Sequence, residues 1–79
     1  MLKHKYDPKA DAIYITLNSG KYFRGDDLDD DRRIDYDENG IPIGIELLSV
    51  SHGVNLRGLP YAQELIEVIK KYGYKDIKV

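Results

Sequence analysis

The sequence has no cysteine and no tryptophan, and only one phenylalanine among its 79 residues. Without cysteine, disulfides cannot support the small core of such a chain, and a reducing compartment is compatible with the composition. A domain of this length buries only roughly 60–65% of the surface that its unfolded chain exposes, so we expect modest stability. We predict a single domain that spans residues 1–79.

Long apolar runs are also missing. No uninterrupted apolar segment approaches the roughly 20 residues that a membrane helix requires. The first residues, Met1–Lys5, are not followed by the apolar segment of a secretory signal peptide. These patterns predict a soluble, cytoplasmic protein without a membrane partner.

Neither sign of charge dominates the sequence. The 12 lysines and arginines stand against 14 aspartates and glutamates, which gives a formal net charge of −2. Such a balance lacks the strong positive field that attracts nucleic acids, so we expect no nucleic-acid partner.

Aromatic content is concentrated in tyrosine, of which there are seven. Tyrosine suits half-buried sheet faces and interfaces, because one end of its ring stays in contact with water. Packing within a sheet explains the excess most simply. A tyrosine-rich contact surface is the alternative.

Period-two alternation of apolar and polar residues runs through the first two-thirds of the chain and predicts a β-sheet. The clearest unit is a hairpin with Glu38-Asn39-Gly40 as its tight turn, because asparagine and glycine tolerate positive φ. Pro42 belongs at the start of the second strand or on an edge, since it cannot donate a ladder hydrogen bond. The acidic stretch 26–33 is expected to be a solvated loop. The expected strands are residues 2–6, 12–17, 21–24, 33–37 and 41–48.

The last third of the sequence changes to helical spacing. After an expected loop at residues 49–59, Pro60 suits a first helical turn, apolar residues recur with period 3.6, and Gly73 is a natural stop. Residues 76–79 are compatible with one more short strand. The predicted fold class is α+β: a small curved antiparallel sheet of four to five strands, with one C-terminal amphipathic helix packed on its apolar face.

One string resembles a calcium-binding loop. Asp35, Asp37, Asn39 and Glu46 occupy positions at which such a loop supplies carboxylate and amide ligands. That loop requires a helix on each side, whereas here a strand pattern follows it. We therefore interpret the string as the hairpin and predict no metal site, with a weak divalent-metal site at these four residues as the alternative.

Residues suited to catalysis are scarce. His52 lies near Ser49 and Ser51, but neighbours in one loop rarely adopt the geometry of a nucleophile and its base, and no orienting acid is evident. Glu46 and the aspartates of the same hairpin are the remaining candidates, for a small carboxylate-dependent hydrolase or nuclease. We expect no enzymatic activity, no catalytic residue and no cofactor.

Two blocks of sequence resemble a known family. They are Tyr6-Asp7-Pro8 with Asp11-Ala12-Ile13-Tyr14-Ile15, and Asp35-Tyr36-Asp37-Glu38-Asn39-Gly40 with Gly44-Ile45-Glu46-Leu47-Leu48. Over about residues 6–51 the chain resembles the small prokaryotic proteins called domain of unknown function 2283. The resemblance implies a compact β-rich domain and favours the hairpin interpretation. It brings no established activity, cofactor or catalytic residue, although the proximity of some members to toxin-like genes implies a candidate antitoxin-like role.

The leading hypothesis for function is a non-enzymatic protein-interaction module, either a homodimer or the partner of another small protein. It rests on the thin core and on apolar residues left on the sheet face opposite the helix. The candidate interaction surface contains Tyr14 and Leu48, with Ala12 as a further member. Coverage of that face by residues 49–59 is the alternative.

Overall fold

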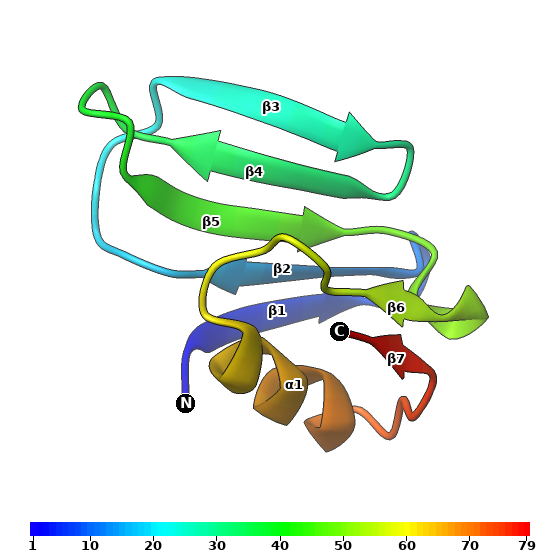
Figure 1. Ribbon diagram of the computed structural model, residues 1–79. Helices are drawn as coiled ribbons and strands as arrows, with labels where there is room; N and C mark the ends of the chain where they lie inside the picture. Colours follow the sequence, from blue (N-terminus) through cyan, green and yellow to red (C-terminus); the bar gives the residue numbers. More distant parts are fainter.

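The computed structural model describes all of residues 1–79. A five-stranded antiparallel sheet has the strand order β1-β2-β5-β4-β3 (Figure 1), and the predicted α+β class is confirmed. Its strands are β1 Lys3–Asp7, β2 Ala12–Thr16, β3 Arg24–Asp29, β4 Arg32–Tyr36 and β5 Pro42–Leu47. The other elements are the 3₁₀ turn η1 Val50–His52, β6 Val54–Asn55, the helix α1 Ala62–Lys71 and β7 Ile77–Lys78. No helix has the length and apolar character that crossing a membrane demands.

The central strand β5 separates the two faces of the sheet. Its odd-numbered members, Ile43, Ile45 and Leu47, are buried, and Glu46 between them lies on the opposite face. Pro42 stands at the strand start, as predicted, where its missing N–H interrupts no interior ladder position. Because β5 pairs with both β2 and β4, the apolar residues of all three strands lie on the same face of the sheet.

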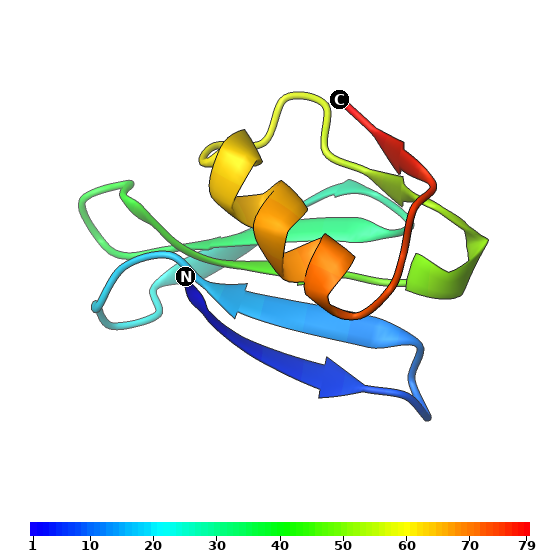
Figure 2. The same ribbon diagram turned by 90° about the horizontal axis from the view of Figure 1, so that it is seen from below.

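One face of the sheet is covered by two segments. Figure 2 shows α1 and the chain that follows β5 on the same side of the sheet. The helix contributes Leu65, Val68 and Ile69 to the core, all of them completely buried. Fully burying an aliphatic side chain stabilises a fold by about 1.5–3 kcal/mol, so each of these three helix residues contributes substantially to stability.

The segment 49–59, predicted as a plain loop, is part of the core. It includes η1 and β6, and it buries Val50, Val54, Leu56 and Leu59 against the sheet. Strand β6 pairs in parallel with β7, so the last short strand belongs to a second small sheet. The helix begins at Ala62 rather than at Pro60, since Tyr61 before it has a left-handed backbone.

The prediction for residues 21–33 is wrong in its extents. Instead of a strand at 21–24 and a loop at 26–33, β3 and β4 form a hairpin around a turn at Asp30 and Asp31. β3 is an exposed edge strand, so it needs no apolar alternation, and opposite charges stabilise it across the hairpin. Two ion pairs, Arg33–Asp27 and Arg32–Asp29, join the two strands of this hairpin, whereas Arg24–Asp26 lies within β3 and Arg33–Asp35 within β4.

We predict that Ile45→Asp unfolds the domain and that Glu46→Ala leaves it folded. Ile45 has no exposed surface and pairs with Ile15 and Ile34, so an unpaired carboxylate there costs several kcal/mol, much of the stability of a small domain. Thermal unfolding followed by circular dichroism measures both variants. Equal losses of stability would show that the two faces of β5 are assigned wrongly.

Candidate functional site

The uncovered face of the sheet carries a row of polar side chains that crosses all five strands. The pairing register connects Lys5 on β1 with Tyr14 on β2, then with Glu46, Arg33 and Asp27 on β5, β4 and β3. We call these five residues the charged row and this side of the sheet the open face. The charged row is basic at the β1 edge and ends in an acidic residue at the β3 edge.

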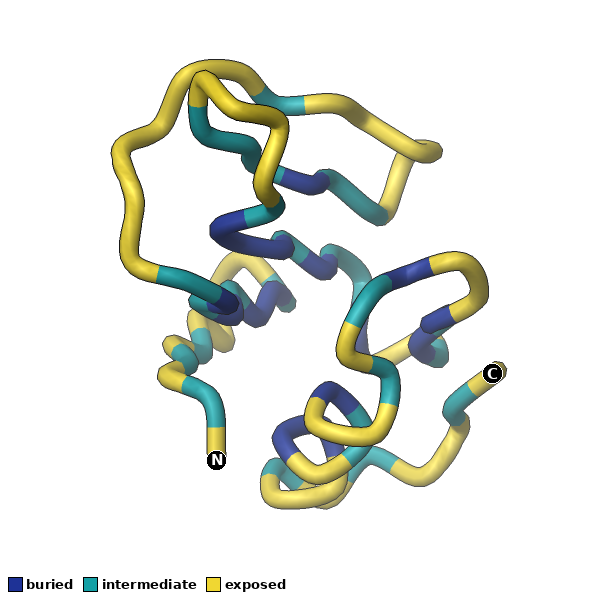
Figure 3. The backbone as a smooth tube through the Cα atoms, turned by 60° about the vertical axis from the view of Figure 1, so that its left-hand side comes forward, coloured by how far each residue is buried: buried dark blue, intermediate teal, exposed yellow.

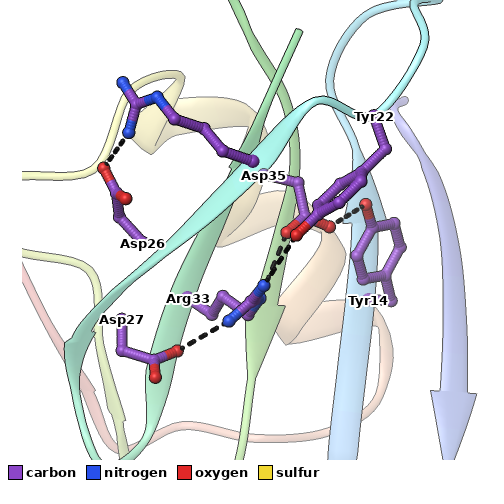
Figure 4. A network of polar contacts seen from close by, with 7 residues as sticks. Tyr14, Tyr22, Asp26, Asp27, Arg33 and Asp35 are labelled. Carbon is purple, nitrogen blue, oxygen red and sulfur yellow. Dashed lines mark hydrogen bonds and ion pairs between the residues drawn. The ribbon is translucent and has the colours of Figure 1, made fainter.

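Arg33 is the centre of a hydrogen-bonded network on the open face (Figure 4). Its Nε donates to Asp35 Oδ1 and its Nη1 to Asp27 Oδ1, each at 3.2 Å, and its Nη2 donates to the Tyr22 hydroxyl at 3.0 Å. Tyr14 donates its hydroxyl proton to Asp35 Oδ2 at 2.9 Å. An exposed ion pair contributes about 0–1 kcal/mol, so the main effect of the network is to fix the direction of the guanidinium and of both rings.

Two glycines make room for this network. A Cβ atom at Gly44 would lie 1.9 Å from the Tyr14 hydroxyl oxygen, and one at Gly25 would lie 2.2 Å from Arg33 Nη2. The Tyr14 ring therefore lies across the backbone of β5 to reach Asp35 on β4, and Arg33 lies across β3. Larger residues at either glycine would displace these side chains.

The environment of Tyr14 raises the pKa of its phenol to about 12. Burial is the largest cause, followed by the hydrogen bond to Asp35 and the nearby negative charges of Asp35 and Glu46. Tyr14 is therefore protonated at neutral pH and acts as a hydrogen-bond donor. Such a group is poorly suited to act as a base or nucleophile.

The four residues of the metal alternative do not converge. Asp35 and Glu46 lie on the open face, with Asp35 bound to Arg33, whereas Asp37 belongs to the β4–β5 turn. There Asp37 Oδ1 accepts hydrogen bonds from the N–H of Asn39 and of a second turn residue, both at 2.9 Å. No group of three or more His, Cys, Asp or Glu side chains is arranged to hold a metal ion.

Asp11 joins the β1–β2 turn to the segment after β5. Its carboxylate accepts the Ser51 hydroxyl at 2.6 Å and the Ser51 N–H at 3.1 Å, and its backbone oxygen accepts the N–H of Val50 at 3.1 Å. The Ser51 hydroxyl thus fixes the loop, and the exposed His52 makes no hydrogen bond to it. This long-range contact was not evident from the sequence, because 40 residues separate its partners.

The predicted interaction residue Tyr14 lies on β2, and Leu48 directly follows the neighbouring strand β5. Tyr14 pairs with Glu46, two residues before Leu48, and the Leu48 N–H continues the ladder by donating to Asp31 O at 2.8 Å. The surroundings are polar rather than apolar, because Tyr14 belongs to the charged row. Segment 49–59 covers the other face of the sheet, so it does not cover Tyr14.

Sequence reasoning missed Arg33 and Tyr22 as site residues. Arg33 shares its strand face with Asp35, and this spacing is a usable signal once β4 is recognised. Tyr22 comes from the β2–β3 connection, and no periodicity in that segment predicts its contact with Arg33.

Comparison with known proteins yields one match. A family model described as "Protein of unknown function (DUF2283)" matches residues 3–51, more than half of the chain. The matched part contains all five strands of the main sheet and the Asp11–Ser51 contact, and it ends before α1. Searches of the curated proteins and of the solved structures gave no significant match.

We predict that two tyrosines titrate late in a spectrophotometric pH titration. The pKa of Tyr14 is about 12 because of burial and Asp35, and that of Tyr74 is about 12 because of its hydrogen bond with Tyr6. Tyr14→Phe should remove one of the two late groups, and Asp35→Asn should lower the pKa of Tyr14 without restoring the ordinary value. Loss of a group near pH 10 in Tyr14→Phe would contradict the geometry.

The same shift makes stability depend on alkaline pH. Below pH 10, the ordinary pKa of tyrosine, Tyr14 is protonated in both the folded and the unfolded chain. Between pH 10 and about 12 the unfolded chain releases this proton and the folded chain retains it, so stability falls as the pH rises through this window. Tyr14→Phe should show a smaller fall in the midpoint of urea unfolding between pH 9 and 11.

Calcium should have no effect on stability. A ligand that binds only the folded form must raise the melting temperature, and Asp37 and Asp35 are engaged with backbone amides and Arg33. We expect the same melting temperature with millimolar calcium as with a chelator. A rise that disappears in Asp35→Ala would restore the metal alternative.

Proposed function

Because the chain belongs to the family of proteins of unknown function DUF2283, we propose its function from the site: it is a non-enzymatic interaction module that self-associates through the open face. The proposal rests on the charged row. It begins with Lys5 and ends with Asp27, so a second copy in reversed orientation offers opposite charges. Charge complementarity of this kind selects partners and fixes their register.

The reversal follows from symmetry. When two open faces meet about a two-fold axis parallel to the strands, the strand order of one sheet runs against that of the other. With the axis over β5, Lys5 of each copy faces Asp27 of the other, and Tyr14 faces Arg33. These pairings occur twice. A guanidinium over a tyrosine ring adds a cation–π contact to each pair of opposite charges.

Glu46 is the one unfavourable element in this arrangement. It occupies the middle of the charged row, so it meets its own copy at the axis. It forms no ion pair within its own chain. Two like charges in contact oppose association. The same geometry therefore predicts that neutralising Glu46 strengthens the dimer. Neutralising a carboxylate elsewhere on the surface should not have this effect.

The open face is small for a stable dimer. Five strands spaced about 4.8 Å apart, with five residues that each rise about 3.3 Å, give a projected area of roughly 400 Å². Stable interfaces bury about 800 Å² per partner. We therefore propose a weak, reversible dimer. The fixed orientations of Arg33 and Tyr14 favour it, because side chains that are already ordered lose little entropy on binding.

We predict that charge exchange controls the dimer. In sedimentation equilibrium between 10 and 500 µM, about the range for a weak interface, Lys5→Glu and Asp27→Lys should each reduce self-association, because each variant opposes like charges twice. The double variant Lys5→Glu/Asp27→Lys restores opposite pairs and should restore association. Glu46→Gln should strengthen it, and Leu48→Lys, beside the charged row, should weaken it.

Lys9→Glu is the matched control for Lys5→Glu. It makes the same change in net charge at an exposed residue in the β1–β2 turn, outside the charged row, and should leave the association unchanged. Circular dichroism verifies that each variant is folded. A wild-type protein that is monomeric at 500 µM would exclude the homodimer, and a double variant no better than its parents would exclude this orientation.

A further inference from the structure

A second surface lies at the end of the sheet where the β2–β3 connection passes the β4–β5 turn (Figures 1 and 3). Both segments are largely exposed, and between them is an open groove of about 450 Å³. The N–H of Phe23 donates to Tyr36 O at 2.8 Å and ties the connection to the end of β4. The groove is lined by Lys21, Tyr22, Phe23, Asp37, Glu38 and Asn39.

The lining combines exposed aromatic rings with carboxylates. Tyr22 and Phe23 are 54% and 63% exposed. Glu38 makes no hydrogen bond or ion pair, and Asp37 uses Oδ1 for the turn amides and leaves Oδ2 free. Lys21 is the only cation of the lining. The groove therefore presents two negative charges against one positive charge, beside two rings.

We propose that this groove binds an arginine side chain of an extended partner peptide. A planar guanidinium stacks on an aromatic ring and donates two hydrogen bonds to a carboxylate, and this lining offers both partners. A volume of 450 Å³ accommodates the side chain together with adjoining peptide backbone. This inference concerns a different surface from the proposed dimer and does not depend on it.

The chain itself contains the same combination. The guanidinium of Arg24 lies 4.5 Å from the centre of the Tyr36 ring and forms an ion pair with Asp26. An arginine that contacts both a tyrosine ring and an aspartate therefore already occurs beside this groove. The groove has aromatic rings and carboxylates but no arginine, and in our proposal the partner peptide supplies the arginine.

The groove is formed before any ligand arrives. Asp37 fixes the turn through its amide hydrogen bonds, and Gly40 adopts the positive φ of 77° that the turn requires. Tyr22 is held by the hydrogen bond from Arg33 Nη2 to its hydroxyl. Binding thus orders little of the protein, which preserves the modest energy of an exposed cation–π contact.

The test is an NMR titration of the full chain with N-acetyl-arginine methylamide. The neutral isostere N-acetyl-citrulline methylamide serves as the comparison. We expect the arginine compound to shift the backbone amide signals of Tyr22, Phe23, Glu38 and Asn39. The citrulline compound should bind at least about threefold more weakly than the arginine compound. Equal binding of the two compounds, or shifts centred elsewhere, would overturn the proposal.

Variants make the test sharper, because two of them change affinity in opposite directions. Glu38→Gln and Phe23→Ala should each weaken binding roughly two- to fivefold, the value of one exposed cation–π or charge contact. Lys21→Ala should strengthen it by removing the competing cation. Glu64→Gln, on the exposed side of α1, makes the same charge change as Glu38→Gln and should have no effect. Equal affinities for Glu38→Gln and Lys21→Ala would exclude recognition by charge.

Discussion

The rest of the structure depends on one constraint: the chain has enough apolar material to cover only one face of its sheet. The ten-residue α1 and the segment 49–59 both pack on the same side, over Ile13, Ile15 and Ile45. The other face must remain stable in water, so its side chains satisfy one another. The ring of Tyr14 lying over Gly44, and the three donors of Arg33, follow from that requirement.

The elements that were predicted correctly are those with a buried face. β2 and β5 carry aliphatic residues at every second position because one side of each is covered, and the helix has its apolar stripe because it forms the cover. The predicted strand at 21–24 ends where β3 begins, because both sides of β3 meet water and nothing in its sequence has to alternate. The segment 49–59 was missed for a different reason. Its 3₁₀ turn and its two-residue strand are too short to produce a recognisable period in the sequence.

The site was predictable in part, and the limit is again physical. Strand parity places Tyr14 opposite the core side, and this much follows from the sequence. Its neighbours depend on register and strand order, which bring Asp35 and Arg33 to it from β4 across β5. Strand order is set by long-range packing, so local patterns do not contain it. For that reason the acidic string has the spacing of ion ligands in the sequence, although in the structure Asp37 stabilises a turn and Asp35 pairs with Arg33.

The family match and the folded core have different extents, and the difference bears on function. The match ends at residue 51, yet Val68 and Ile69 of α1 complete the core over the matched strands. The part that the family model describes thus includes the open face and only one side of the core. Tyr22 belongs to this part and touches both proposed surfaces, since its hydroxyl accepts from Arg33 and its ring lines the groove. Because Arg33 already holds Tyr22 in the single chain, sharing this residue does not by itself link the two binding events, and the groove is available with or without the dimer.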